Sequence, residues 1–115
     1  MPIRLFHNPR CSKSREALAL LRERGVEPEV VEYLKQPPTA VEIDALLTRL
    51  AIEPRQLMRK GEAVYKELGL DAPALTRAAL IEAMAQNPIL IERPIATDGK
   101  RAVLGRPPEK VLELL

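Results

Sequence analysis

The stretch that decides the fold is residues 3–24, which read IRLFHNPRCSKSREALALLRER. Pro2 to Phe6 predicts a short buried strand, and Asn8-Pro9 is a turn signal. Helical periodicity then runs from Ser12 to Arg24, with alanines and leucines on one face. A strand that passes through a short turn into a helix brings the residues of that turn to one end of the predicted sheet.

The chain continues in the same pattern beyond this stretch. Gly25 suits a helix end, and Val30 to Leu34 predicts a second strand. A strand–helix–strand unit normally has parallel strands joined by a right-handed crossover. The first third of the chain therefore predicts two parallel strands and a covering helix.

The middle of the chain, residues 39–87, is predicted to be almost entirely helical. Thr39 and Glu42 have the spacing of a capping box, and the helix that follows has one leucine-rich face. Further helices are expected to start at Glu53-Pro54, to run from Glu62 to Leu68, and to run from Thr76 to Asn87. No strand signal interrupts these helices, so we interpret residues 39–87 as a helical insertion.

The last part of the chain returns to strands. Pro94 to Thr97 and Lys100 to Leu104 flank Asp98-Gly99, a strong hairpin signal. A final helix is expected over Glu109 to Leu115, with Val111, Leu112 and Leu115 on its apolar face. This element order predicts an α/β fold of the thioredoxin-like type, a mixed four-stranded sheet with a helical insertion. We expect one domain spanning residues 1–115.

The composition excludes several classes of protein. Aromatic residues make up 3% of the chain and the formal net charge is +2, which argues against a nucleic-acid partner. No apolar run approaches the length of a membrane span, and no signal peptide is recognisable. One cysteine and one histidine cannot build a disulfide framework or a zinc site without several carboxylates. We expect a cytoplasmic monomer without a membrane, metal or bound cofactor.

Cys11 is the residue whose position points to chemistry. It follows a turn and opens a helix, where free backbone N–H groups and the helix dipole favour thiolate over thiol and also favour a bound oxyanion. Arg10, Lys13 and Arg15 add positive charge. The alternative interpretation is a small buried hydrophobic residue. Because Ser14 stands where a Cys-x-x-Cys motif has its second cysteine, redox chemistry would need an external thiol.

The neighbours of Cys11 have two interpretations each. His7 either stabilises the thiolate as imidazolium or makes a hydrogen bond within the loop. Ser12 and Ser14 are either ordinary residues at a helix start or donors to a bound anion. We assign His7 to the catalytic group, and Ser14 and Arg15 to an oxyanion pocket.

Three other arginines have unusual contexts. Arg59 lies at a helix break, Arg93 precedes Pro94 at the start of a strand, and Arg106 lies between Gly105 and Pro107. In a thioredoxin-like sheet, the proline that enters the third strand faces the nucleophile loop, so Arg93 is expected near Cys11. The guanidinium fork suits a tetrahedral oxyanion better than lysine does. The Arg93–Pro94 bond is also a candidate for the cis form.

The sequence resembles the glutaredoxin-linked arsenate reductase family, ArsC, along essentially its whole length. The nucleophile loop matches as His7-Asn8-Pro9-x-Cys11-x-x-Ser14-Arg15, and its Cys-Ser-Lys-Ser-Arg segment is similar to that of a short, arsenate reductase-like branch. The other matching segments are Tyr33-Leu34 with Pro37-Pro38-Thr39, Leu57-Met58-Arg59-Lys60, residues 65–70, residues 87–95, and Gly105-Arg106-Pro107-Pro108.

The resemblance implies an activity and a set of partners. Cys11 would attack arsenate or a similar oxyanion and form a covalent adduct. Glutathione would act as co-substrate, glutaredoxin would take over the glutathione linkage, and arsenite would leave. Arg59, Arg93 and Arg106 would hold the oxyanion, and His7 would tune the cysteine.

Two other functions stay open at this point. A sister branch of Spx-like regulators binds RNA polymerase and often carries Cys-x-x-Cys, which Ser14 does not match. A general glutathione-linked thiol oxidoreductase would also use Cys11, with little dependence on the three arginines.

Overall fold

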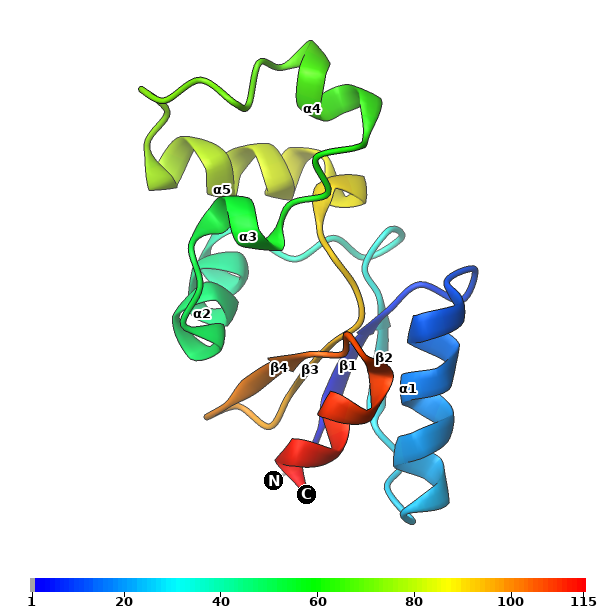
Figure 1. Cartoon of the computed structure of the whole chain (residues 1–115). Coiled ribbons are helices and arrows are strands. Elements are labelled where there is room, and N and C mark those ends of the chain that lie inside the picture. The colour runs from blue at the N-terminus through cyan, green and yellow to red at the C-terminus, as the bar shows by residue number, and fades with distance from the viewer. Residues whose placement is uncertain (1) are drawn as a thin grey trace. The chain divides into compact units, whose positions relative to one another are not determined.

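The computed structural model describes residues 2–115 and contains a four-stranded mixed sheet (Figure 1). Its strands are β1 (Arg4–His7), β2 (Glu29–Glu32), β3 (Ile95–Thr97) and β4 (Ala102–Leu104), in the order β2-β1-β3-β4. β1 and β2 are parallel, whereas β3 is antiparallel to both β1 and β4. The predicted thioredoxin-like fold class is confirmed.

The chain divides into two compact units. The first contains the residues up to Gln36 together with Arg93–Leu115, and the second is Pro37–Glu92. The second unit begins and ends close to the predicted insertion at residues 39–87. That the whole chain is one domain stays a prediction.

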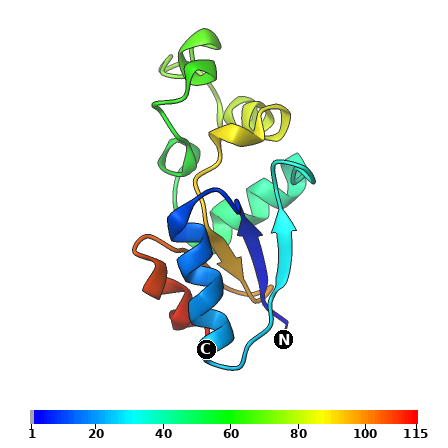
Figure 2. The same cartoon turned by 90° about the vertical axis from the view of Figure 1, so that its right-hand side faces the viewer.

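The core of the first unit lies between the sheet and two helices. Helix α1 (Ser12–Glu23) and the 3₁₀ helix η2 (Pro108–Leu114) lie side by side on one face of the sheet, as Figure 2 shows. Buried side chains from the sheet, α1 and η2 form one cluster, which consists of Ile3, Leu5, Ala17, Leu21, Ala96, Val111 and Leu114. This packing anchors α1, and so fixes the helix end that Cys11 occupies.

The last helix differs from the prediction in its periodicity. It is a 3₁₀ helix in which Pro108, Val111 and Leu114 are buried, whereas Leu115 is 52% exposed. A 3₁₀ helix has three residues per turn, so residues three apart share a face. The predicted α-helical face that included Leu115 is therefore wrong.

Two strand boundaries also differ from the prediction. β2 ends at Glu32 rather than Leu34, because the Glu32 carbonyl accepts from the N–H groups of Lys35 and Gln36 and the chain turns there. β4 starts at Ala102 rather than Lys100, because the N–H groups of Lys100 and Arg101 donate to the Asp98 carboxylate instead of a ladder. The hairpin itself is confirmed, with Gly99 at φ +93° in its turn.

The second unit is built from short helices. They are α2 (Ala40–Leu50), α3 (Pro54–Leu57), α4 (Ala63–Glu67), α5 (Arg77–Gln86) and the 3₁₀ helix η1 (Pro88–Leu90). The Thr39 capping box is present, with the Glu42 N–H donating to the Thr39 hydroxyl. An isolated β-bridge pairs Met58 with Ile91, which lies just beyond the predicted insertion, and no strand occurs within residues 39–87. Within residues 2–115, no helix has the length and apolar character to cross a membrane.

Candidate active site

Cys11 is the N-cap residue of α1, at the end of a loop that Asn8 organises. The Cys11 N–H donates to the Asn8 carbonyl at 3.0 Å, and the Arg10 N–H donates to Asn8 Oδ1 at 3.0 Å. Cys11 has extended backbone angles, and its carbonyl accepts from the Arg15 N–H at 3.0 Å. These bonds place the thiol at the positive end of a helix that has no acidic residue in its first turn.

The surroundings of the Cys11 thiol favour its ionised form. Burial on its own raises the pKa of Cys11, but the Ser14 N–H, the Arg93 guanidinium and the Lys13 N–H outweigh burial and lower that pKa below its ordinary value. The Cys11 side chain makes no capping hydrogen bond in the structure. Once ionised, its sulfur can accept hydrogen bonds from these N–H groups and from the guanidinium. Cys11 is 8% exposed, so the structure combines the burial of the alternative interpretation with the cationic surroundings of a nucleophile.

Arg93 and Arg106 reach Cys11 from the far end of the chain. Arg106 Nη2 lies 4.0 Å from the Cys11 sulfur, and Arg106 Nε donates to the Arg93 carbonyl at 3.0 Å. Arg93 immediately precedes Pro94 and β3, which is antiparallel to β1. The expected proximity of Arg93 to Cys11 is present in the structure. The Arg93–Pro94 bond is cis, and the Arg106–Pro107 bond is cis as well.

Gly105 allows the two arginine segments to lie together. Its N–H donates to the Pro94 carbonyl at 2.8 Å. A Cβ atom at Gly105 would lie 2.7 Å from Pro94 Cγ and 3.1 Å from Val111 Cγ1. Only glycine fits this approach without a shift of the proline ring. Sequence reasoning named Gly105 in a motif without this role, and its only local signal was the position next to Arg106.

Ser14 and His7 form a buried pair beneath the loop. The Ser14 side chain has no solvent exposure, and its Oγ lies 3.1 Å from His7 Nδ1. The Asn8 N–H also donates to Ser14 Oγ at 3.1 Å. The Ser14 hydroxyl is therefore bonded to the end of β1, and it is the Ser14 backbone N–H that favours the Cys11 thiolate.

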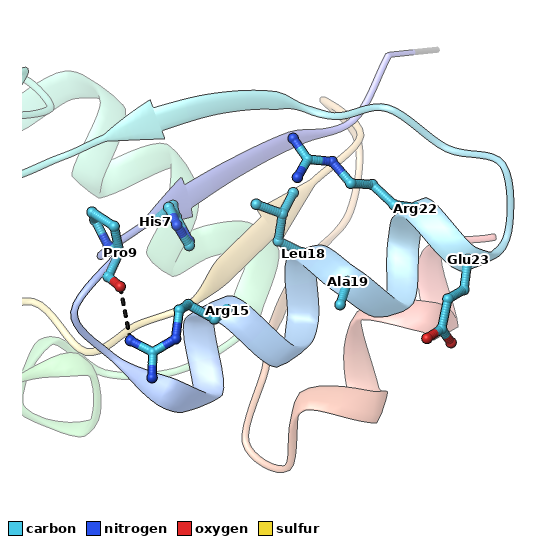
Figure 3. A pocket seen from close by; sticks show the side chains of 7 residues that line it. All are labelled: His7, Pro9, Arg15, Leu18, Ala19, Arg22 and Glu23. Carbon is cyan, nitrogen blue, oxygen red and sulfur yellow. Dashed lines mark hydrogen bonds between the residues drawn. The ribbon is translucent and has the colours of Figure 1, made fainter.

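Arg15 lies on an open groove beside the loop. Its Nη1 donates to the Pro9 carbonyl at 2.9 Å, the dashed line in Figure 3. The groove has a volume of about 640 Å³ and is lined by His7, Pro9, Arg15, Leu18, Ala19, Arg22 and Glu23. The bond from Arg15 to Pro9 ties the first turn of α1 to the loop.

Arg59 belongs to the second unit, where acidic residues surround it. The backbone N–H of Arg59 donates to the Leu90 carbonyl at 2.7 Å. Its guanidinium lies 3.1 Å from a Glu62 carboxylate oxygen and 3.8 Å from a Glu92 carboxylate oxygen. Its assignment to the oxyanion pocket stays a prediction.

The described part of the chain shows no constellation that would hold a metal ion. Residues 2–115 contain no group of three or more histidine, cysteine, aspartate or glutamate side chains with suitable geometry. The chemistry that the first unit can support is nucleophilic attack by a thiolate on an anion held by N–H groups and guanidinium groups.

The family follows from a comparison with known proteins. The model of the ArsC family matches residues 6–114. The chain belongs to the ArsC family. The matched region includes the nucleophile loop and both arginine segments described above, so the resemblance inferred from the sequence is confirmed.

Relatives of this ArsC-family chain match it over almost its whole length. An arsenate reductase of Neisseria meningitidis (serogroup A) is 48% identical over 98% of this chain and 97% of its own. The uncharacterized protein YfgD of Escherichia coli (strain K12) is 53% identical over 98% of this chain and 96% of its own. The solved structure of an arsenate reductase from Vibrio cholerae has a TM-score of 0.96 and 48% identity, covering 100% of this chain and 98% of that one.

Proposed function

We propose that this protein reduces arsenate to arsenite through a covalent adduct on Cys11, with glutathione and glutaredoxin as electron donors. The observation that carries the proposal is the low-pKa Cys11 thiol at the start of α1, next to Arg93 and Arg106. Membership of the ArsC family and the arsenate reductases among its relatives support the substrate.

The first step joins sulfur to arsenic without a change of oxidation state. The Cys11 thiolate attacks arsenate, an As–O bond breaks, and the oxygen leaves as water after protonation. N–H groups at the helix start and the two guanidinium groups would neutralise the charge of the bound oxyanion. A glutathione thiol then displaces a second oxygen as water and forms an As–S bond.

The second step carries the electrons. A glutaredoxin thiol attacks the glutathione sulfur, the two sulfurs form a mixed disulfide, and the electron pair of the As–S bond remains on arsenic. Arsenic is thereby reduced by two electrons, and hydrolysis of the remaining Cys11–arsenic bond releases arsenite and the thiol. Since Cys11 is the only cysteine in the chain, both oxidised sulfurs come from external thiols.

The proposal includes a cytoplasmic location, because that compartment keeps thiols reduced. It is tested by arsenate-dependent NADPH oxidation with glutathione, glutathione reductase and glutaredoxin supplied. We expect turnover by the wild type and none by Cys11→Ser, because a hydroxyl at this position is a far weaker nucleophile. Activity that survives Cys11→Ser overturns the mechanism.

The same assay separates the finer parts of the proposal. Replacing glutathione and glutaredoxin by a thioredoxin system is expected to abolish turnover, and sustained turnover would contradict the donor assignment alone. Turnover of a glutathione mixed disulfide without arsenate, unaffected by Arg106→Ala, would instead support a general thiol oxidoreductase.

A further inference from the structure

The Ser14 hydroxyl is a polar group that lies next to the nucleophile loop and bonds to β1. Ser14 is fully buried, and its Oγ has two partners, the Asn8 N–H and His7 Nδ1, each at 3.1 Å. The hydroxyl can donate one hydrogen bond and accept two. These limits decide which atom of the pair holds the proton.

The proton positions follow from counting donors and acceptors. The Asn8 N–H can only donate, so Ser14 Oγ accepts in that bond. The hydroxyl proton then needs an acceptor, since a buried donor without one costs stability. His7 Nδ1 lies at hydrogen-bond distance to accept it. A ring nitrogen that accepts carries no proton, so the imidazole is neutral with its proton on Nε2.

The charges around His7 agree with a neutral ring. Burial is the largest influence and lowers the pKa of His7. Glu32, the register partner of His7 on β2, raises that pKa, whereas Arg22 and Arg15 on α1 lower it. The net effect is a pKa below the ordinary histidine value, which favours the uncharged ring.

We propose that His7 and Ser14 form a neutral hydrogen-bonded clamp that positions the nucleophile loop. The Ser14 hydroxyl joins the end of β1 to the first turn of α1, and this holds the Lys13 and Ser14 N–H groups toward the Cys11 sulfur. His7 and the Ser14 hydroxyl are positioning groups, and His7 supplies no positive charge to the thiolate. The inference deepens the proposed function and rests on it only in taking Cys11 as the nucleophile.

The protonation state of His7 can be measured without any substitution. His7 is the only histidine in the chain, so the ¹⁵N NMR signals of imidazole belong to it alone. At neutral pH we expect a protonated Nε2 and an unprotonated Nδ1. A proton on Nδ1, in the neutral or the doubly protonated ring, overturns the proposal.

The positioning role is tested by the pH dependence of Cys11 alkylation by iodoacetamide. Ser14→Ala is expected to raise the midpoint by roughly one pH unit, a tenfold loss of reactivity at low pH. His7→Asn keeps a neutral acceptor near the position of Nδ1 and is expected to retain the wild-type midpoint. His7→Ala removes the acceptor and is expected to behave like Ser14→Ala.

Ser12→Ala is the matched control, because Ser12 is an exposed serine in the same turn, and its midpoint is expected to match the wild type. An unchanged midpoint in Ser14→Ala, or an equal rise in His7→Asn and His7→Ala, overturns the clamp. Alkylation needs no arsenate, so this result is independent of whether arsenate is turned over.

Discussion

The surroundings of the buried Cys11 sulfur lower the pKa of its thiol, and sequence reasoning predicted only part of these surroundings. The sequence alone predicted the turn, the helix start and the nearby cations. The burial of Cys11 and the contact with Arg106, which lies 95 positions further along the chain, were not predictable. Both follow from strand register, which no local pattern contains. The role of Gly105 was missed for the same reason, whereas the hydrogen bonds of Asn8 lie within the turn that Asn8-Pro9 predicted.

We expect alkylation of Cys11 to titrate below the ordinary thiol pKa of about 8.5. Arg93→Ala should move the midpoint up by roughly one unit, because the guanidinium stabilises the thiolate. Arg77→Ala, which removes an arginine paired with Asp44 in the second unit, should leave it unchanged. A wild-type profile that titrates at the ordinary value would contradict the electrostatic account of the site.

The β3–β4 hairpin and the segment after it carry Arg106 to the site. Asp98-Gly99 predicted this hairpin correctly, since its turn chemistry is local. The helix type of η2 could not be predicted in the same way. A 3₁₀ helix has three residues per turn and an α-helix has 3.6, so over seven residues the two place several of the same positions on one face. Only the packing of Val111 and Leu114 distinguishes the two helix types here.

Gly105→Ala should destabilise the protein by about 1–3 kcal/mol, because the new methyl group overlaps the Pro94 ring. The shift of Pro94 should also raise the KM for arsenate, since Arg93 precedes it. Gly61→Ala is the matched control: its Cβ would meet no atom within 4 Å, and the expected change is within about 0.5 kcal/mol. Urea unfolding measures the free energy of unfolding of both variants. Equal losses in Gly105→Ala and Gly61→Ala would refute the close approach of Gly105 to Pro94.

Asp98 should make the stability of the hairpin depend on pH. The Arg101 and Lys100 N–H groups are the first causes that lower the pKa of Asp98 to about 2. A lowered pKa in the folded state stabilises the protein above the ordinary carboxyl pKa of about 4, and this is lost as the pH falls toward the folded value. Asp98→Asn should therefore be less stable than the wild type at neutral pH. Chemical denaturation should show that the difference in free energy of unfolding between the wild type and Asp98→Asn shrinks as the pH falls. A difference that stays constant across the acid range would contradict this role of Asp98.

The molecule as a whole combines a sheet unit that carries the thiol with a helical unit that carries Arg59. The element order was predictable, because caps, prolines and apolar periodicity are local. The bridge between Met58 and Ile91 was not, since it pairs two single residues outside any strand. The family resemblance added Arg59, whose partners in its own unit are Glu62 and Glu92.

Arg59→Ala should raise the KM for arsenate about tenfold if its guanidinium takes one charge-assisted contact to the oxyanion. The comparison is Arg77→Ala, which removes a paired arginine from the same unit and should leave the KM unchanged. Steady-state kinetics with varied arsenate measures both. Equal KM values for Arg59→Ala and the wild type would remove Arg59 from the proposed pocket.

In the proposed mechanism, the burial of Cys11 would determine which atom the second thiol meets. With 8% of the residue exposed, the sulfur offers little surface to a peptide-sized reagent, whereas a small tetrahedral anion can reach it. Once the arsenate group is attached, its arsenic atom would lie farther out than the sulfur. In the proposed mechanism, glutathione would then be directed to arsenic and not to the Cys11 sulfur, so the protein would avoid being trapped as its own mixed disulfide. The shielding that limits access to the thiol would thus also select the productive path for the proposed intermediate.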